Sequence, residues 1–411
     1  MSDLDTPPSM LDTPPEQNRL AEVAGLFLRL GFTAFGGPAA HIAMMRNEVV
    51  QRRKWVSDER FLDLMSIINL IPGPNSTQLA IYLGYLRAGW PGLLLAGICF
   101  IGPAMLIVLV LAWLYVHYGA LPQASGFLYG IKPIVVAIIG QALWGLCRSV
   151  LKGFWPIFLA LAALLLYLLG INSLLLLLGG GLFLSIVRWI ERRRNVRKEK
   201  LVNVFAPFPL LSLRSLWHTL SASSLMQAFG VTLIATPVSM FAIFFVFLKL
   251  GAIVYGSGYV LLAFLRTDLV QGLHWITDRQ LLDAISIGQF TPGPVFTTAT
   301  FIGYLVGGFP GALLATLGIF LPSFAFIALI HPLASRLRRY TWTSALLEGI
   351  NSAALALMGG VLLQLGRSAL VDPLTWVLAL TALIVLLRFK INSIWLILIG
   401  AIAGIVYFQL R

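Results

Sequence analysis

Long apolar runs alternate with short polar segments along almost the whole chain. Residues 92–116 and 154–170 are two such runs, rich in leucine, alanine and aromatic side chains. A helix needs about 20 apolar residues to cross a bilayer. The pattern therefore predicts an all-α polytopic membrane protein with about ten to thirteen membrane segments. Composition agrees, because only 11% of the 411 residues are charged, whereas soluble proteins average about 25%.

One run is interrupted near its middle by Pro-Gly-Pro at 72–74. Proline removes a backbone donor and clashes with the preceding turn, so this sequence breaks a helix. Broken backbone in lipid leaves polar groups without partners, which costs several kcal/mol per group. A helix that restarts after Pro74 presents free amides and its positive dipole end, which favour an anion. Four polar side chains follow and are predicted to line the break: Asn75, Ser76, Thr77 and Gln78.

A plainer interpretation of the break stays open. It is a proline kink packed inside protein, with the hydroxyl groups bonded to local carbonyls. The binding site is favoured because the motif occurs twice and polar residues follow both copies.

The chain is a duplication. Residues 46–74 recur at 266–294, an offset of 220 positions (266 − 46 = 220). The second half therefore has its own Pro-Gly-Pro, centred on Gly293 and followed by Thr297 and Thr298. The sequence predicts four regions: a disordered tail at 1–19, a first transporter repeat at 20–190, a basic cytoplasmic linker and connecting segment at 191–239, and a second transporter repeat at 240–411.

Charge predicts that the two repeats are inverted. Loop 46–54 is basic, whereas its copy at 266–274 has kept only one of four basic residues. Later the bias reverses, because 117–126 has no lysine or arginine and 336–339 reads Arg-Leu-Arg-Arg. Equivalent loops then face opposite sides of the membrane, as in many secondary transporters. The basic segment 188–200 is predicted to be cytoplasmic, and the first Pro-Gly-Pro to be the tip of a re-entrant hairpin.

A second glycine-rich break precedes each Pro-Gly-Pro, and a cation lies just ahead of it. Such a cation faces protein or water, or it extends to the membrane interface. The residues predicted to bind substrate are Asn75, Ser76, Thr77, Gln78, Thr297, Thr298, Gly36, Gly37, Gly73, Gly293, Arg29 and Lys249.

Charged residues around the two motifs are predicted to couple protons or to gate transport. Asp63 and Asp283 either exchange protons, cap helices or pair with Arg46 and Arg266. Arg46 and Arg266 are also interpreted as forming interface ion pairs with the nearest acids, Glu48 and Asp268. The set is Asp63, Asp283, Arg46, Glu48, Arg266 and Asp268.

Several classes of function are disfavoured. The net charge of +13 resides in segments between apolar runs, which the positive-inside rule explains, so no nucleic-acid partner is expected. The five histidines and two cysteines show no ligand spacing, so no metal or other cofactor is expected. A membrane-embedded enzyme would need an inward cluster with catalytic spacing, and the sequence has none. The expected partner is the lipid bilayer, and a homodimer is left open.

The motifs together resemble the chromate ion transporter family, in its long-chain form with two homologous halves. The resemblance rests on Phe-Gly-Gly-Pro at 35–38, the stretch from Arg46 to Trp55, and Pro-Gly-Pro at 72–74 and 292–294. The second half departs from the pattern, since Val295 and Phe296 replace Asn75 and Ser76. The first half is therefore expected to supply more of the polar contacts.

The resemblance implies a function. It implies a secondary transporter in the cytoplasmic (inner) membrane that exports chromate, confers chromate resistance and uses the proton-motive force. Sulfate, a similar tetrahedral dianion, is the expected competitor. The alternatives are a permease for sulfate or another anion with the same architecture, and an anion channel.

Overall fold

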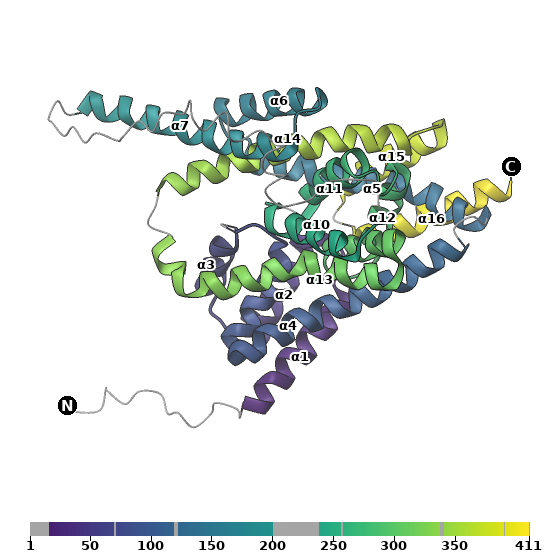
Figure 1. Cartoon of the computed structure of the whole chain (residues 1–411), viewed down its shortest axis with the longest axis horizontal. Coiled ribbons are helices and arrows are strands. Elements are labelled where there is room, and N and C mark those ends of the chain that lie inside the picture. Colours follow the sequence, from purple (N-terminus) through teal and green to yellow (C-terminus); the bar gives the residue numbers. More distant parts are fainter. Residues whose placement is uncertain are drawn as a thin grey trace.

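The structure is a computed structural model that describes residues 16–69, 71–118, 122–199, 238–255, 258–337, 341–389 and 391–410. Every regular element in these ranges is helical, as the sequence predicted (Figure 1). Of the predicted tail and linker, residues 1–15 and 200–237 lie outside the described residues.

The first half contains seven α-helices and a π-helical segment, η2: α1 (Glu16–Thr33), α2 (Gly37–Arg46), η2 (Asn47–Arg52), α3 (Asp58–Ile68), α4 (Asn75–Tyr118), α5 (Pro122–Val150), α6 (Phe154–Leu168) and α7 (Ser173–Glu199). The second half repeats this order, with short 3-10 turns η3 and η5 and a second π-helical segment, η4: α10 (Met240–Ile253), η3 (Gly258–Val260), α11 (Leu261–Leu265), η4 (Arg266–Gly272), α12 (Asp278–Phe290), η5 (Val295–Thr297), α13 (Thr298–Leu337), α14 (Thr341–Ala369), α15 (Pro373–Arg388) and α16 (Ser393–Gln409).

The apolar helices match those of a multi-pass membrane protein. Among the described residues, five helices are long and apolar enough to cross a membrane: α4, α5, α7, α13 and α14. Four shorter apolar helices accompany them: α6, α10, α15 and α16. Their outer faces expose apolar side chains, such as Leu165 of α6 and Ile402 of α16. Apolar surface of this extent is expected to lie against lipid, which agrees with the predicted fold class.

Each Pro-Gly-Pro motif leads into a short arm that folds back. In α4 the backbone leaves the helical region at Ala88 and Gly89, and in α13 it does so at Gly307 and Gly308. The reversal brings Gly84 against Gly92, at a spacing that leaves no room for a Cβ atom on either residue. The arm between Pro74 and Ala88 is thus too short to span a bilayer, as predicted for the hairpin.

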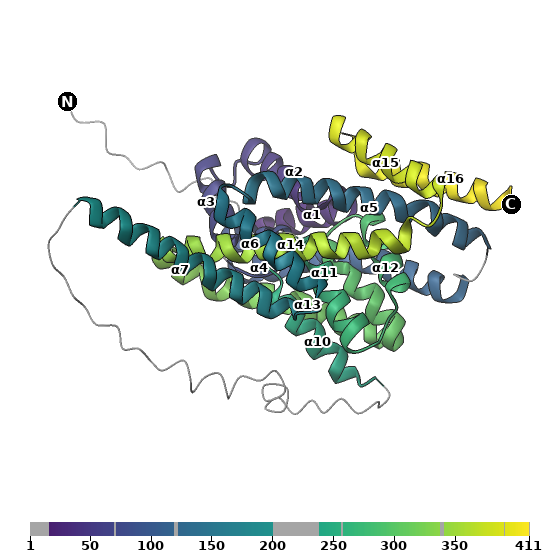
Figure 2. The ribbon, with the colours of Figure 1, turned by 90° about the horizontal axis from the view of Figure 1, so that it is seen from above.

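The two halves are interwoven. Helix α5 of the first half packs against α15 and α16 of the second, and α14 of the second half packs against α6 and α7 of the first (Figure 2). Helices α4 and α13 also lie against each other. The exchange is therefore reciprocal, since each half contributes a helix that packs against two helices of the other.

Candidate functional site

The two Pro-Gly-Pro motifs are each bound by the opposite half. The backbone N–H of Gly73 donates to the carbonyl oxygen of Val254 at 2.7 Å, where α10 has just ended. The N–H of Gly293 donates to the carbonyl oxygen of Ala34 at 2.8 Å, where α1 has just ended. The two bonds are equivalent at the repeat offset of 220 positions (254 − 34 = 220 and 293 − 73 = 220). All four breaks therefore form one connected centre.

Glycine is required at the middle of both motifs. Gly73 has φ +122° and Gly293 has φ +88°, in the region that side chains with a Cβ rarely adopt. A Cβ at Gly73 would collide with the side-chain amide of Gln78 and lie 3.1 Å from Ser323 Oγ. A Cβ at Gly293 would lie 2.6 Å from the methyl group of Ala104. Ser323 and Ala104 thus occupy equivalent places, and only the first-half motif faces a hydroxyl group.

Polar atoms without partners gather around Gly73. Ser76, Thr77 and Gln78 are all at most 2% exposed, and Gln78 Nε2 donates to Pro72 O at 2.6 Å. Within the described part of the chain, four nearby buried atoms have no hydrogen-bond partner: Asn75 Oδ1, Thr77 Oγ1, Gln78 Oε1 and Ser323 Oγ. Leaving a buried polar group unsatisfied costs about 1–3 kcal/mol. Such a cluster is expected where a polar guest binds.

Backbone amides point to the same place. The first amides of a helix have no acceptor within it, and Gln78 N–H, which donates to Pro74 O at 2.9 Å, is the first of this segment to bond back. The amides at the start of α4 and the positive end of its dipole therefore face the break. The start of α4 combines free amides with the hydroxyl of Thr77, and α13 brings the hydroxyl of Ser323 beside them.

His41 connects the two first-half breaks, and the sequence analysis gave it no role. Its Nε2 lies 3.0 Å from Ala34 O, and because a carbonyl only accepts, this nitrogen carries the hydrogen. Its Nδ1 then accepts from Ser76 Oγ, at 3.5 Å. Helix α2 brings His41 here after a turn at Gly36 and Gly37, whose φ angles are +102° and +76°. The available signal was a polar ring in an apolar run just after a glycine break.

The second half uses its hydroxyl groups locally. Thr297 Oγ1 donates to Pro294 O at 2.7 Å, and Thr298 Oγ1 donates to Val295 O at 2.8 Å. This is the arrangement that the proline-kink interpretation describes, and it leaves neither threonine a hydrogen to donate to a guest. The ring of Phe296, which takes the place of Ser76, is buried and packs against the ring of Phe320. The two halves of the centre therefore differ in polarity.

The predicted cations are held by carboxylates. Arg29 Nη2 lies 2.6 Å from Glu48 Oε1, and its counterpart Lys249 Nζ lies 2.7 Å from Asp268 Oδ2. Glu48 also receives Arg52 and Arg53. Burial alone would raise the pKa of Glu48, but the hydrogen bonds from Arg52, Arg29 and Arg53 lower it below its usual range.

The pairing of Arg46 and Arg266 differs from both expectations. Arg46 Nε and Nη2 donate to the two carboxylate oxygens of Asp58, each at 2.7 Å. Arg266 holds Asp278 in the same way, at 2.7 and 3.1 Å. These arginines therefore bind the first acid of α3 and α12 rather than Glu48, Asp268, Asp63 or Asp283. The bidentate geometry of arginine with carboxylate explains the preference, and the hydrogen bonds from Arg46 lower the pKa of Asp58.

The two aspartates before the motifs have different surroundings. Asp63 is half-buried on α3, whereas Asp283 on α12 is buried and contacts Lys132 and Tyr115 of the first half. A lysine inside an apolar run was a signal for Lys132 that the sequence analysis did not use.

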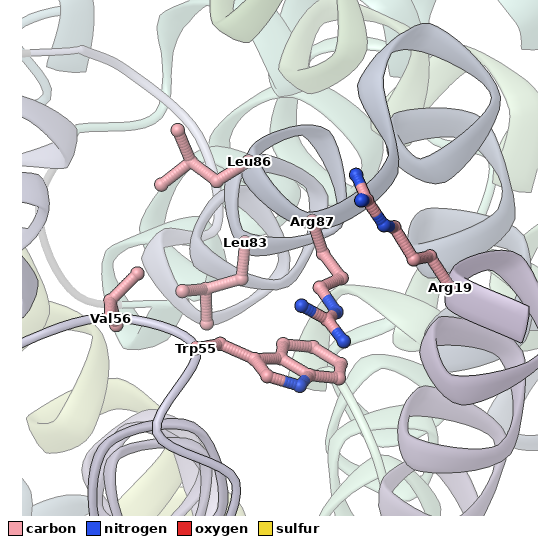
Figure 3. Close-up of a pocket in the computed structure, with 6 residues that line it drawn as sticks. All are labelled: Arg19, Trp55, Val56, Leu83, Leu86 and Arg87. Carbon is pink, nitrogen blue, oxygen red and sulfur yellow. The ribbon is translucent and has the colours of Figure 1, made fainter. Parts of the chain in front are cut away.

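A separate hollow opens near the start of α1. It has a volume of about 150 Å³ and is lined by Arg19, Trp55, Val56, Leu83, Leu86 and Arg87 (Figure 3). The guanidinium of Arg87 lies 5.4 Å from the Trp55 ring centre and binds Glu22 at 2.7 Å. No residue of the predicted site lines this hollow. Among the residues described, no cluster of three or more histidine, cysteine or acidic side chains has the arrangement of a metal site.

Comparison with known proteins identifies the family. The sequence profile of the Chromate transporter family matches residues 21–185 and 241–405. The chain belongs to this family. The two matched regions are the two copies of the duplication that the sequence predicted.

Relatives match over most of their length. The Chromate transport protein of Cupriavidus metallidurans is 34% identical over 95% of this chain and 94% of its own. The Probable chromate transport protein of Synechococcus elongatus is 32% identical over 95% and 96%. The Chromate transport protein of Pseudomonas aeruginosa is 30% identical over 83% and 80%. No solved structure matches the chain.

Proposed function

We propose that this protein exports chromate across the cytoplasmic membrane as a secondary transporter and thereby confers chromate resistance. Membership of the family and the names of the relatives support chromate as the substrate. The observation that carries the site is the group of unpartnered buried polar atoms around Gly73, contributed by Thr77, Gln78 and Ser323.

The proposed site holds a tetrahedral oxyanion by neutral donors. The hydroxyl groups of Thr77 and Ser323 and the first amides of α4 donate to its oxygens, while Gly73 lets the backbone approach closely. Helix N-termini suit anions because their amides are free and their dipole is favourable. Thr297, Thr298 and Gly293 shape the opposite wall, and Gly36 and Gly37 form the break that admits His41. Arg29 and Lys249, each beside a carboxylate, act on the anion as charges near the entrance rather than as direct ligands.

Membrane potential favours export. Moving a dianion out of a negative interior releases about 2 × 2.3 kcal/mol per 100 mV. That energy supports an accumulation ratio of roughly three decades before any proton is coupled. A permease for sulfate or another anion is the second candidate, because hydroxyl and amide donors discriminate poorly between tetrahedral dianions of similar size.

Inverted membrane vesicles test the proposal directly. Radiolabelled chromate is expected to accumulate in them saturably, with inhibition by sulfate and by a protonophore. Thr77→Ala or Ser323→Ala should raise KM about 10- to 100-fold, since a hydrogen bond to a charged group contributes about 1.5–3 kcal/mol. Ser352→Ala is the matched control, because Ser352, like Ser323, is buried in the second half, but its hydroxyl donates to Glu348 O.

Each outcome decides a different point. Vesicles that contain verified protein but show no chromate flux would overturn the function and favour the other-anion permease. Chromate flux with normal KM in both variants would keep the function but remove the site.

A further inference from the structure

A buried ion pair joins the two halves. Asp283 of α12 is 1% exposed, and its Oδ1 lies 2.7 Å from Nζ of Lys132 on α5. Its Oδ2 accepts a hydrogen bond from the Tyr115 hydroxyl of α4, at 2.9 Å. Lys132 and Tyr115 both lie in helices long and apolar enough to span a membrane. Ionisable groups inside membrane-spanning helices are costly to keep and usually serve transport.

The equivalent place around Asp63 lacks both the lysine and the tyrosine. At the repeat offset of 219 that holds in this region (367 − 148 = 219), Lys132 corresponds to Asn351 and Tyr115 to Ala334. Asp63, the counterpart of Asp283, is half-buried on α3. The buried carboxylate with its own cation therefore occurs at only one of the two equivalent places.

The pair lies close to the proposed site. Seven residues of α12, or about 10 Å of helix, separate Asp283 from Phe290 at the end of that helix. Tyr115 packs edge-on against Phe301, with ring centres 5.2 Å apart, one turn after the start of α13. A change at Asp283 therefore reaches the second Pro-Gly-Pro motif along α12 and the start of α13 through Tyr115.

In the described part of the chain, two side chains contact this carboxylate. Lys132 of α5 and Tyr115 of α4 contact it directly, and Arg279, one turn earlier on α12, acts on the Tyr115 hydroxyl. Arg266 of the neighbouring η4 is already bound to Asp278. The charge of Asp283 is thus balanced by Lys132, and adding a proton to Asp283 leaves that lysine without its counter-charge.

We propose that Asp283 is the proton-binding residue of the transport cycle, with Lys132 as its counter-cation and Tyr115 as a positioning residue. The inference rests on the proposed function and names its coupling site. A proton from the aqueous side forms an O–H bond on the Asp283 carboxylate, and the ion pair to Lys132 is lost. The tie between α5 and α12 then weakens, so the halves move relative to each other. The same proton leaves to the opposite side when the pair forms again.

The test uses the full-length protein in proteoliposomes with the membrane potential clamped. Chromate flux is measured with a pH gradient at zero potential, and with a potential at equal pH. For each proton coupled, one pH unit changes the accumulation ratio about tenfold. Asp283→Asn should abolish this response and keep the flux that the potential drives. Glu348→Gln should keep both, because Glu348 also pairs across the halves, with Arg188 at 2.8 Å, at a less buried position.

A second variant separates coupling from folding. The double variant Lys132→Met/Asp283→Leu removes both charges, which proteins often tolerate better than loss of one partner. We expect it to fold, to carry chromate under a potential and to ignore the pH gradient. A pH response retained by either Asp283 variant would overturn the inference, as would a folded double variant that is inactive in both modes. Absence of chromate flux in the wild type would instead overturn the proposed function, and this inference with it.

Discussion

The backbone N–H of Gly73 in the first half donates to the carbonyl oxygen of Val254 in the second, at 2.7 Å. Its symmetric counterpart joins Gly293 to Ala34. Each Pro-Gly-Pro motif is therefore stabilised by a break in the other half, which answers the problem of unsatisfied backbone in lipid. The same bonds make the breaks move together, since neither motif can shift without losing a bond to the opposite half.

Replacing the central glycines tests this arrangement. Gly73→Ala and Gly293→Ala each place a side chain where φ is strongly positive, at a cost of about 1–3 kcal/mol, and each meets a close neighbour. We expect lower thermal stability in detergent and loss of most chromate flux. Gly25→Ala is the control, because Gly25 is helical and nothing lies within 4 Å of its added Cβ. Normal flux in both motif variants would show that the breaks tolerate displacement.

A negative charge at Gln78 tests the sign of the substrate. Gln78→Glu removes the donor to Pro72 O and brings a carboxylate beside the hydroxyls of Thr77 and Ser323. Repulsion between like charges at short range should lower chromate affinity at least about 100-fold, which corresponds to roughly 3 kcal/mol. The control is Gln364→Glu, because a carboxylate oxygen at this position can still accept the hydrogen bond that the Tyr167 hydroxyl donates to Gln364 Oε1. The KM for chromate is measured in vesicles for both variants, and equal KM values would exclude an anion at Gln78.

The second half of the protein suggests a substitution for His41. The second half has Leu261 at the equivalent position, so His41→Leu should fold. It removes the hydrogen bonds to Ala34 O and Ser76 Oγ, and we expect maximal flux to fall about tenfold, from loss of about 0.5–1.5 kcal/mol in each bond. His41→Asn, which can still donate to Ala34 O, should recover part of that flux. Flux of His41→Leu equal to wild type would assign the ring to packing against Phe100.

The Glu48 cluster predicts how stability depends on pH. The folded-state pKa of Glu48 is lowered, with burial opposing the effect of Arg52, Arg29 and Arg53. The ionised carboxylate therefore adds stability above its unfolded pKa of about 4.3, and this contribution is lost as pH falls through the folded pKa. Glu48→Gln should lower the melting temperature clearly at pH 7 and less at pH 4. An equal loss at both values would mean that the ion pairs do not matter.

Local sequence was sufficient for the helical fold, the duplication and the breaks, because each depends on runs or motifs that can be read along the chain. It also indicated that the first half is the more polar, from Asn75 and Ser76 against Val295 and Phe296. Ser323, Lys132 and Tyr115 could not be assigned in this way. Each acts on a residue of the opposite half, and the packing of α4 against α13 and of α5 against α12 that brings them together leaves no mark in local periodicity.

The partners in the ion pairs were the feature that the sequence predicted least well. Arg46 is two residues from Glu48, yet the structure pairs it with Asp58, twelve positions away. The π-helical segment Asn47–Arg52 turns the chain between them and directs Glu48 toward Arg29 instead. Proximity along the chain is a poor guide to pairing where the helix changes its period.

The reciprocal bonds have an evolutionary consequence. A chain of half this length would contain both a donor, the Pro-Gly-Pro amide, and an acceptor, the carbonyl after its first helix. Two identical copies in opposite orientations would satisfy each other, whereas one alone would leave both groups bare in lipid. A half-length chain with these features is therefore expected to work only as a pair. In the full-length chain the two halves satisfy each other and are free to differ, the first in polar contacts and the second in a buried carboxylate.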